Sequence, residues 1–300
     1  MRFSIAPDGP FSLAAAAGLG FGPNTGRPET GPGSAADGMR LAFVTDDMAH
    51  HAGAYVTQDP DGTVTADIDT DGDPAAAWRQ VLRVLSLDGP AAGWAGIGTR
   101  DPIIGRLQEE HQTLRPVLFH SPYEAAAWSI ISARRYRGQA TAIRNRLSSE
   151  LGRTFTIAGE PVHAFPLPHR LLKAESLRSV APQRVEWLHA VARAALDGVL
   201  DPGALAGMHP ADALTRLQEL PGIGPSYATL VLIRATGVRD TLTFAEPRLP
   251  GYVAHFYGTG PAPVSAQQLE RVAENWRPFR TWAAVLLRAA GDRLGLPAAA

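Results

Sequence analysis

The segment LTRLQELPGIGPSYATLVLIRATGVRDTLTFAEPRL, residues 214–249, decides how the rest of the chain is interpreted. Apolar residues recur at helical spacing over Leu214–Leu220 and again over Tyr227–Ala235, which predicts two helices. The Pro-Gly-Ile-Gly-Pro turn between them contains glycines that permit positive φ and a close approach of the backbone. We therefore predict a helix, a tight hairpin and a second helix.

The hairpin backbone is a candidate anion site. Its amides and those of the first residues of the second helix are expected to point outward at the positive end of a helix dipole, where a phosphate oxygen binds well. Such contacts hold a nucleic-acid backbone without reading its sequence. The predicted phosphate-binding residues are Gly222, Ile223, Gly224, Ser226 and Tyr227. Glu246 follows 22 positions after Gly224, where this scaffold would present a carboxylate at the mouth of a cleft.

Three further fragments accompany the hairpin. They are Ser121-Pro-Tyr-Glu-Ala125 with Trp128-Ser-Ile-Ile131, Phe165-Pro-Leu-Pro168, and Trp276-Arg-Pro-Phe-Arg280. With the hairpin they resemble, in order and spacing, the helix-hairpin-helix DNA glycosylases, and in particular the 3-methyladenine DNA glycosylase II branch. The resemblance covers about residues 1–292 and is specific because four fragments occur together.

The resemblance implies a mainly α protein, with a two-lobed helical glycosylase core over residues 96–300 and an N-terminal antiparallel α+β domain over residues 1–95. The residue pattern agrees with this division. In the first part we expect strands at 2–6 and 41–45, a strand hairpin at 54–58 and 63–69, and helices at 11–19 and 78–87. From about residue 100 we expect only helices, near 101–114, 122–150, 168–175, 183–198, 211–219, 226–236, 265–275 and 279–294.

The charge distribution divides the chain in a similar way. The formal net charge is −1, but residues 1–100 carry 6 basic and 12 acidic residues, whereas residues 101–300 carry 22 and 17. A DNA-facing surface is therefore expected in the C-terminal two thirds. Because nucleic-acid-binding domains are usually basic, the near-neutral total leaves open a helical scaffold that does not bind DNA.

Several classes of protein are excluded by composition. The chain has no cysteine, so it has no disulfide and no iron–sulfur cluster of the kind that some relatives carry, and we expect no cofactor. It has no apolar run of 18 residues, and its N-terminus does not read as a secretion signal. We expect a soluble, cytoplasmic protein at the nucleoid. Side chains with metal-ligand spacing, Asp46 with His50, are read as a solvated face rather than a metal site.

The chemistry of N-glycosidic bond cleavage gives Glu246 its predicted role. Cleavage builds positive charge on the sugar, so a carboxylate beside C1′ stabilises the transition state and can orient the attacking water. A base alkylated on a ring nitrogen is already cationic and leaves without a general acid. The family places a catalytic aspartate at the position of Glu246, and glutamate is one methylene longer. Two readings stay open: a working catalytic carboxylate, or a fold that has kept DNA recognition and lost catalysis.

Two other positions depart from the family pattern. Ala133 and Arg134 stand where the family usually has glutamine, which removes a polar contact to the DNA. Ser226 stands where bifunctional relatives carry a Schiff-base lysine, and the only lysine is Lys173. The resemblance therefore implies a monofunctional, hydrolytic enzyme without lyase activity.

Aromatic and basic side chains complete the predicted site. The candidates for stacking on an extruded base are Tyr123, Trp128, Tyr136, Tyr227 and Trp282, and the alternative for the tryptophans is a place in the core. Arg134 and Arg135 are candidate DNA contacts, and the alternative is that they cap a helix. The family also implies a monovalent cation at the carbonyls of Leu220 and Ile223. The expected partner is double-stranded DNA with a damaged base, bound by a monomer without an obligate protein partner.

Overall fold

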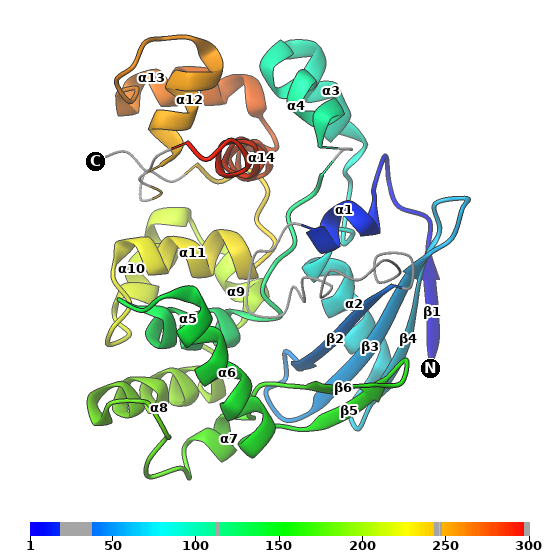
Figure 1. Ribbon diagram of the computed structural model, residues 1–300, viewed down its shortest axis with the longest axis vertical. Coiled ribbons are helices and arrows are strands. Elements are labelled where there is room, and N and C mark those ends of the chain that lie inside the picture. The colour runs from blue at the N-terminus through cyan, green and yellow to red at the C-terminus, as the bar shows by residue number, and fades with distance from the viewer. Residues whose placement is uncertain (19–37, 112–113, 243–245, 247, 297–300) are drawn as a thin grey trace.

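The computed structural model describes residues 1–18, 38–111, 114–242, 246 and 248–296. These residues form an N-terminal sheet domain and two helical lobes, here called the middle lobe and the C-terminal lobe (Figure 1). Within the described ranges, none of the helices has the length and apolar character needed to cross a membrane.

An antiparallel sheet of four strands forms the N-terminal domain, in the order β1-β4-β3-β2. The strands are β1 (Arg2–Ile5), β2 (Met39–Val44), β3 (His51–Gln58) and β4 (Val64–Thr70). Helices α1 (Leu13–Gly18) and α2 (Pro74–Val84) lie on one face, where Leu13, Trp78 and Val81 share a core with strand residues such as Leu41 and Phe43. Asp73 starts α2 by accepting a hydrogen bond from the amide of Ala75.

A two-stranded sheet covers the opposite face of the N-terminal sheet. It consists of β5 (Thr154–Ile157) and β6 (Glu160–His163). Phe155 and Ile157 pack with Ala42, which points away from its neighbours Leu41 and Phe43 because side chains alternate along a strand. With both faces covered, β2 is buried along nearly its whole length.

The middle lobe holds the hairpin. Its helices are α5 (Pro122–Ser132), α6 (Arg137–Leu151), α7 (Pro168–Leu171), α8 (Pro182–Leu196), α9 (Pro202–Gly207), α10 (Pro210–Gln218) and α11 (Pro225–Ala235). They enclose one apolar core in which α5 packs against both α8 and α11. The hairpin joins α10 to α11, so its second helix is seated on this core.

The C-terminal lobe combines helices from two separate parts of the chain. They are α3 (Ala92–Arg100), α4 (Pro102–Glu110), α12 (Leu249–Tyr257), α13 (Ala266–Ala273), the 3₁₀ turn η1 (Glu274–Trp276) and α14 (Arg280–Arg293). Figure 1 shows this lobe stacked on the middle lobe, with α14 running between α12 and α4. The segment 236–242, which leaves α11, crosses from one lobe to the other and leads to Glu246.

The expected fold class is confirmed: the described residues are mainly helical, with an antiparallel sheet in the N-terminal domain. Both hairpin helices lie where the apolar spacing predicts them. The expected division at residue 95 falls inside α3, whose Trp94 and Ile97 pack in the core of the C-terminal lobe.

Two expectations about the helical part are wrong. The single helix expected over 122–150 is two helices, because the chain turns between Ser132 and Arg137, and Arg134 there has a positive φ of 54°. The strands β5 and β6 interrupt the part expected to be all helical. Their turn is Ala158-Gly159, in which both residues have positive φ, and the strands gain a buried face from the N-terminal sheet.

Candidate active site

The hairpin turn is fixed by one glycine. Gly222 has a φ of +84°, and a Cβ built there would lie 2.6 Å from the ring of Trp187 on α8. Only glycine fits a site that combines left-handed backbone with so close a neighbour. The amide of Ile223 donates to the carbonyl oxygen of Leu220 at 3.0 Å, and the Ile223 side chain is buried. The shape of the turn is therefore set from within the middle lobe.

The start of α11 leaves backbone donors available. Gly224 is the residue before the helix, with no side-chain cap, and Pro225 has no amide hydrogen. The amides of Ser226 and Tyr227 lie in the first turn, where helix geometry provides no acceptor for them. Ser226 is exposed and Tyr227 is half-buried. This arrangement suits a phosphate oxygen, as predicted for these residues.

The predicted cation site rests on the carbonyls of the same turn. The carbonyl oxygen of Leu220 already accepts the Ile223 amide, which leaves it one lone pair for a metal ion. This donor set fits a weakly held monovalent cation, since two backbone carbonyls supply oxygen ligands without charge. A bound cation would stabilise the turn, and its presence stays a prediction.

Glu246 lies in a ring of four charged side chains. One carboxylate oxygen is 2.7 Å from Nη1 of Arg288, and the other is 3.3 Å from Nε of Arg248. Nη1 of Arg248 also lies 2.9 Å from Oδ1 of Asp292, whose Oδ2 is 3.7 Å from Nε of Arg288. Each guanidinium thus faces both carboxylates. The hydroxyl of Tyr252 donates to Asp292 at 2.6 Å and fixes the second carboxylate.

The charges of this ring act on neighbouring groups. Burial lowers the pKa of Arg248, but the carboxylates of Glu246 and Asp292 outweigh that effect and raise it. Arg234, at the end of α11, is buried close by, and burial together with the charge of Arg288 lowers its pKa to about 9, against the opposing effect of Glu246. The surroundings of Glu246 are therefore rich in positive charge.

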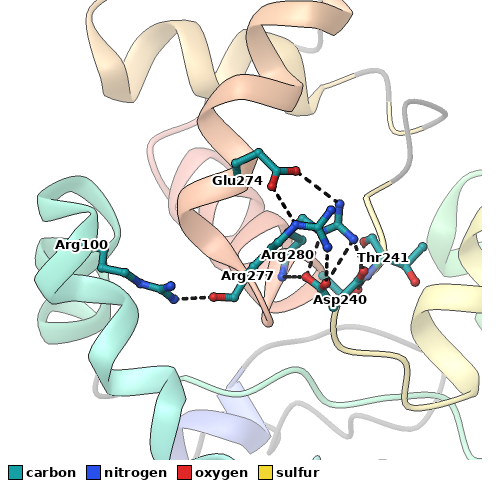
Figure 2. Close-up of polar contacts among 7 residues, drawn as sticks. Arg100, Asp240, Thr241, Glu274, Arg277 and Arg280 are labelled. Atoms are coloured by element: carbon teal, nitrogen blue, oxygen red, sulfur yellow. Dashed lines mark hydrogen bonds and ion pairs between the residues drawn. The ribbon is translucent and has the colours of Figure 1, made fainter.

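A second ion-pair cluster anchors the segment that leads to Glu246. Figure 2 shows Asp240 between Arg280, 2.8 Å from its Oδ1, and Arg277, 3.0 Å from its Oδ2. Arg280 also donates to the carbonyl oxygen of Asp240 at 2.6 Å, and Thr281 exchanges two hydrogen bonds with the backbone of Thr241. The Trp-Arg-Pro-Phe-Arg motif therefore ties this segment to α14.

Trp276 gives that motif its place in the lobe. It is fully buried, and its ring nitrogen donates to Asp101 and to the hydroxyl of Tyr257, each at 3.0 Å. Asp101 in turn caps the start of α4. The motif joins α4, α12 and α14, and it holds the segment that leads to Glu246 against this lobe.

Two of the predicted base-stacking residues are core residues, so those two predictions are wrong. Tyr123 has no exposed surface, stacks edge-on against Phe165 and donates its hydroxyl to the carbonyl of Pro166. Trp282 is 2% exposed and packs edge-on against Trp94. A side chain enclosed on all sides cannot stack on a base, so the core alternative holds for Trp282 and extends to Tyr123.

The other aromatic candidates keep some exposed surface. Trp128 on α5 and Tyr227 on α11 are half-buried against the core of the middle lobe. Tyr136, in the turn between α5 and α6, is 83% exposed. Trp128 and Tyr136 are thus the candidates from α5 and the turn after it that keep exposed surface, and their contact with a base stays a prediction.

Arg134 and Arg135 lie in the same turn but differ in their contacts. Arg135 donates to the carbonyl of Ile131 at 2.7 Å, so it caps the end of α5, which is the structural alternative. Arg184 assists by donating to the carbonyl of Ala133 at 2.8 Å. Arg134 is exposed and has left-handed backbone. Of the two, Arg134 is the better placed for a phosphate.

A cavity of about 740 Å³ lies elsewhere, between α2 and the start of α9. Six of its lining residues are aspartates, namely Asp8, Asp46, Asp47, Asp73, Asp88 and Asp201. Two arginines, Arg79 and Arg83, also line the cavity, so the aspartates exceed them by four, and a surface with this net negative charge repels a phosphodiester backbone. It also lacks Glu246 and the hairpin residues, so we do not assign DNA to it.

Sequence reasoning missed Arg248, Arg288 and Asp292. The only signal that could have found them is the spacing of Arg288 and Asp292, four residues apart on α14. The contact of Arg288 with Glu246 spans 42 positions of sequence, and that of Asp292 with Arg248 spans 44, which no local pattern reveals.

This combination of hairpin, lobes and N-terminal sheet has a counterpart among known proteins: the chain has the fold of the helix-hairpin-helix DNA glycosylases. It superimposes on the 3-methyladenine DNA glycosylase from Archaeoglobus fulgidus with a TM-score of 0.76, over 98% of this chain and 99% of that one, at 19% sequence identity. The 8-oxoguanine glycosylase/lyase of Clostridium acetobutylicum, solved with double-stranded DNA, gives a TM-score of 0.62 at 14% identity, covering 82% of this chain and 86% of that one.

The sequence itself gives a shorter match. A 127-residue segment is 31% identical to DNA-3-methyladenine glycosylase 2 of Escherichia coli (strain K12), which is 40% of this chain and 40% of that protein. The chain therefore matches less than half the length of this curated relative. No protein-family model matches the chain.

Proposed function

We propose that this protein is a monofunctional DNA glycosylase of base excision repair that hydrolyses the N-glycosidic bond of alkylated purines of the 3-methyladenine type in duplex DNA. The shared fold and the partial match to a 3-methyladenine glycosylase support the proposal. We further propose that it acts as a monomer in the cytoplasm, at the nucleoid.

Binding begins at the hairpin. Gly222 and Gly224 bring the backbone close to a phosphate, and the free amides of Ser226 and Tyr227 donate to it. Arg134 contributes a second phosphate contact from the α5 end of the same lobe. With the backbone held at two points, an alkylated base can leave the stack, and Trp128 and Tyr136 are the aromatic side chains available to hold it.

The chemical step uses Glu246. As the bond between C1′ and the cationic base breaks, its electron pair leaves with the base and positive charge develops on the sugar. The Glu246 carboxylate stabilises that charge and orients the water that adds to C1′. With serine at position 226 there is no amine to form a Schiff base, so water is the nucleophile and the DNA strand is left uncut.

The observation that carries the proposal is the pairing of two positioned elements. The hairpin is locked by Gly222 against Trp187, and the segment that carries Glu246 is anchored by Asp240 to Arg277 and Arg280. Hydrolysis of a glycosidic bond in DNA requires two parts. One is a site that binds the DNA backbone, and the other is a carboxylate positioned by the neighbouring lobe.

The test is the release of free base from methylated duplex DNA by the natural protein and by two variants. We expect the natural protein to release 3-methyladenine and Glu246→Gln to be slower by a factor of about 100 or more. Glu246→Asp tests whether the site is adapted to the longer side chain, and we expect it to be slower than the natural protein. Binding without release by the natural protein would contradict the proposal.

A second function is favoured by one observation. Arg248 and Arg288 both contact Glu246, so their charges oppose its stabilising effect on a cationic sugar. A protein that binds DNA and senses lesions without excising them would fit this arrangement. The same assay separates the two, because a sensor binds the methylated duplex and releases no base from it.

A further inference from the structure

The ring around Glu246 sets a problem for the proposed chemistry. Its two guanidiniums and two carboxylates sum to a formal charge of zero, with Arg248 and Arg288 in contact with both Glu246 and Asp292. A carboxylate that must stabilise a cationic sugar loses most of that effect when two cations lie within about hydrogen-bond distance of it. The ring as it stands holds Glu246 in a form unsuited to catalysis.

The ring is also open to solvent. The side chains of Glu246, Arg248, Arg288 and Asp292 are 22%, 27%, 27% and 34% exposed. Ion pairs that keep this contact with solvent are weaker than fully buried pairs, and an anion from solvent can compete for their arginines. A phosphate is such an anion, and a guanidinium binds it through the same two parallel hydrogen bonds that it offers a carboxylate.

The two carboxylates of the ring are held differently. Asp292 receives a hydrogen bond from the buried hydroxyl of Tyr252 at 2.6 Å, in addition to its contact with Arg248 at 2.9 Å. Glu246 has no such support outside the two arginines and the amide of Arg248, among the bonds of the described residues. When an external anion competes, Glu246 is therefore the carboxylate that is displaced, while Asp292 keeps Arg248 oriented.

We propose that Arg248 and Arg288 are ligands of a DNA phosphate, and that this phosphate replaces Glu246 in the ring and thereby frees its carboxylate to act on the sugar. The inference rests on the proposed function and adds the step that frees the Glu246 carboxylate for the proposed reaction. In the absence of DNA, the arginines hold the carboxylate in a neutralised state. When DNA is bound, the two arginines pair with a phosphate of the DNA backbone instead.

A double-mutant cycle of duplex binding tests this exchange. The probe is an undamaged fluorescent duplex, and the proteins are the natural chain, Glu246→Gln, Arg288→Gln and the combined variant. We expect Glu246→Gln to bind about twofold to fivefold more tightly, since its arginines no longer have to leave an internal partner. We expect this gain to be absent from the Arg288→Gln background. Arg288→Gln should also lower the slope of log affinity against log salt by about 1.

The matched control is Asp67→Asn. Asp67 forms an exposed ion pair with Arg2 on the N-terminal sheet at 3.3 Å, so its loss changes the net charge as Glu246→Gln does, at a distant place. Binding by this variant should equal that of the natural protein. Thermal unfolding of each variant verifies its folding, and Arg248→Gln replaces Arg288→Gln if the latter does not fold.

The outcomes separate the inference from the function on which it rests. An equal gain from Glu246→Gln in both backgrounds, or no gain at all, would overturn the inference while leaving base release intact. A natural protein that does not bind the duplex would overturn the proposed function itself.

Discussion

The hairpin of the middle lobe and the Glu246 ring of the C-terminal lobe offer their chemistry in opposite ways. The hairpin uses backbone amides, which its geometry leaves free and which no mutation of a surface side chain removes. The ring uses side chains, and each charged group already has a partner of opposite sign. In the proposed function, one half is ready to bind before DNA arrives, whereas the other must change its contacts first. The comparison predicts that DNA binding and base release can be altered separately.

Among the variants considered, Asp240→Asn is expected to separate base release from duplex binding most strongly. The substitution removes the charge that Arg277 and Arg280 hold, so the segment leading to Glu246 loosens from α14. A displacement of the carboxylate by about 1 Å costs roughly a hundredfold in rate, so we expect base release to fall by about that factor. Duplex affinity, measured on the same sample, should stay within about twofold.

The control for this prediction is Glu274→Gln. Glu274 contacts Arg277 at 2.8 Å and Arg280 at 3.9 Å, and among the described residues 236–242 it has no contact of its own with the segment that leads to Glu246. Release by this variant should stay near that of the natural protein. An equal loss in both variants would mean that the arginines themselves, and not the anchored segment, determine the rate.

The opposite effect, a loss of duplex binding, is expected from Gly222→Ala. The left-handed backbone at this position costs a non-glycine residue about 1–2 kcal/mol, and the new Cβ meets the ring of Trp187. We expect the turn to shift and duplex affinity to fall about tenfold. Gly207→Ala, at the end of α9 in the same lobe, is the matched control, since nothing lies within 4 Å of a Cβ there. If both variants unfold at the temperature of the natural protein, the claim that Gly222 alone fixes the turn is wrong.

The N-terminal sheet domain and the C-terminal lobe are also expected to lose stability at opposite ends of the pH scale. Burial lowers the pKa of His51, which contacts the Phe165 carbonyl at 2.9 Å, so its contribution is complete above pH 6.5 and falls as the pH decreases. Burial, and the hydrogen bond to Asp101, raise the pKa of Tyr257 in the C-terminal lobe. Its contribution is complete below pH 10 and falls as the pH rises.

Each group contributes at most about 1.4 kcal/mol per pH unit. The measurement is the free energy of unfolding against pH for the natural protein, His51→Gln and Tyr257→Phe. His51→Gln should flatten the acid side and Tyr257→Phe the alkaline side. A profile that either variant leaves unchanged would show that the corresponding group does not titrate as its contacts indicate.

The smallest effect concerns the two arginines between α5 and α6. Arg134→Gln should weaken duplex binding a few-fold and lower the salt slope by about 1, because it removes one phosphate contact. Arg135→Gln should leave the salt slope unchanged and reduce thermal stability slightly, since Arg135 caps α5. Titrations of one duplex at several salt concentrations measure both, and a reversed pattern would exchange the two roles.

The elements that could be predicted from the sequence depend on residues that are close together in the chain. The hairpin depends on glycines and on apolar spacing within about 20 residues, so its helices could be predicted directly. Arg134 could not be predicted as a break, because it takes a left-handed conformation without glycine or proline nearby to signal it.

The remaining errors concern packing between distant segments. Tyr123 and Trp282 have the same residue types and spacing as exposed stacking residues, and only the fold places them inside. The ring around Glu246 forms between α14 and the residues before α12, so neither segment alone predicts it. Glu246, to which the family pattern points, could be identified from the sequence, but the charged side chains that contact it could not.

Single-turnover release of 3-methyladenine, with enzyme in excess over a methylated duplex, tests the central claim most directly. Both the natural protein and Glu246→Gln should be saturated with DNA, so that only the chemical step differs. The account predicts release by the natural protein and a rate at least about a hundredfold lower for Glu246→Gln, although the variant binds the duplex as well or better. Equal release by the two proteins, or none by either, would contradict it.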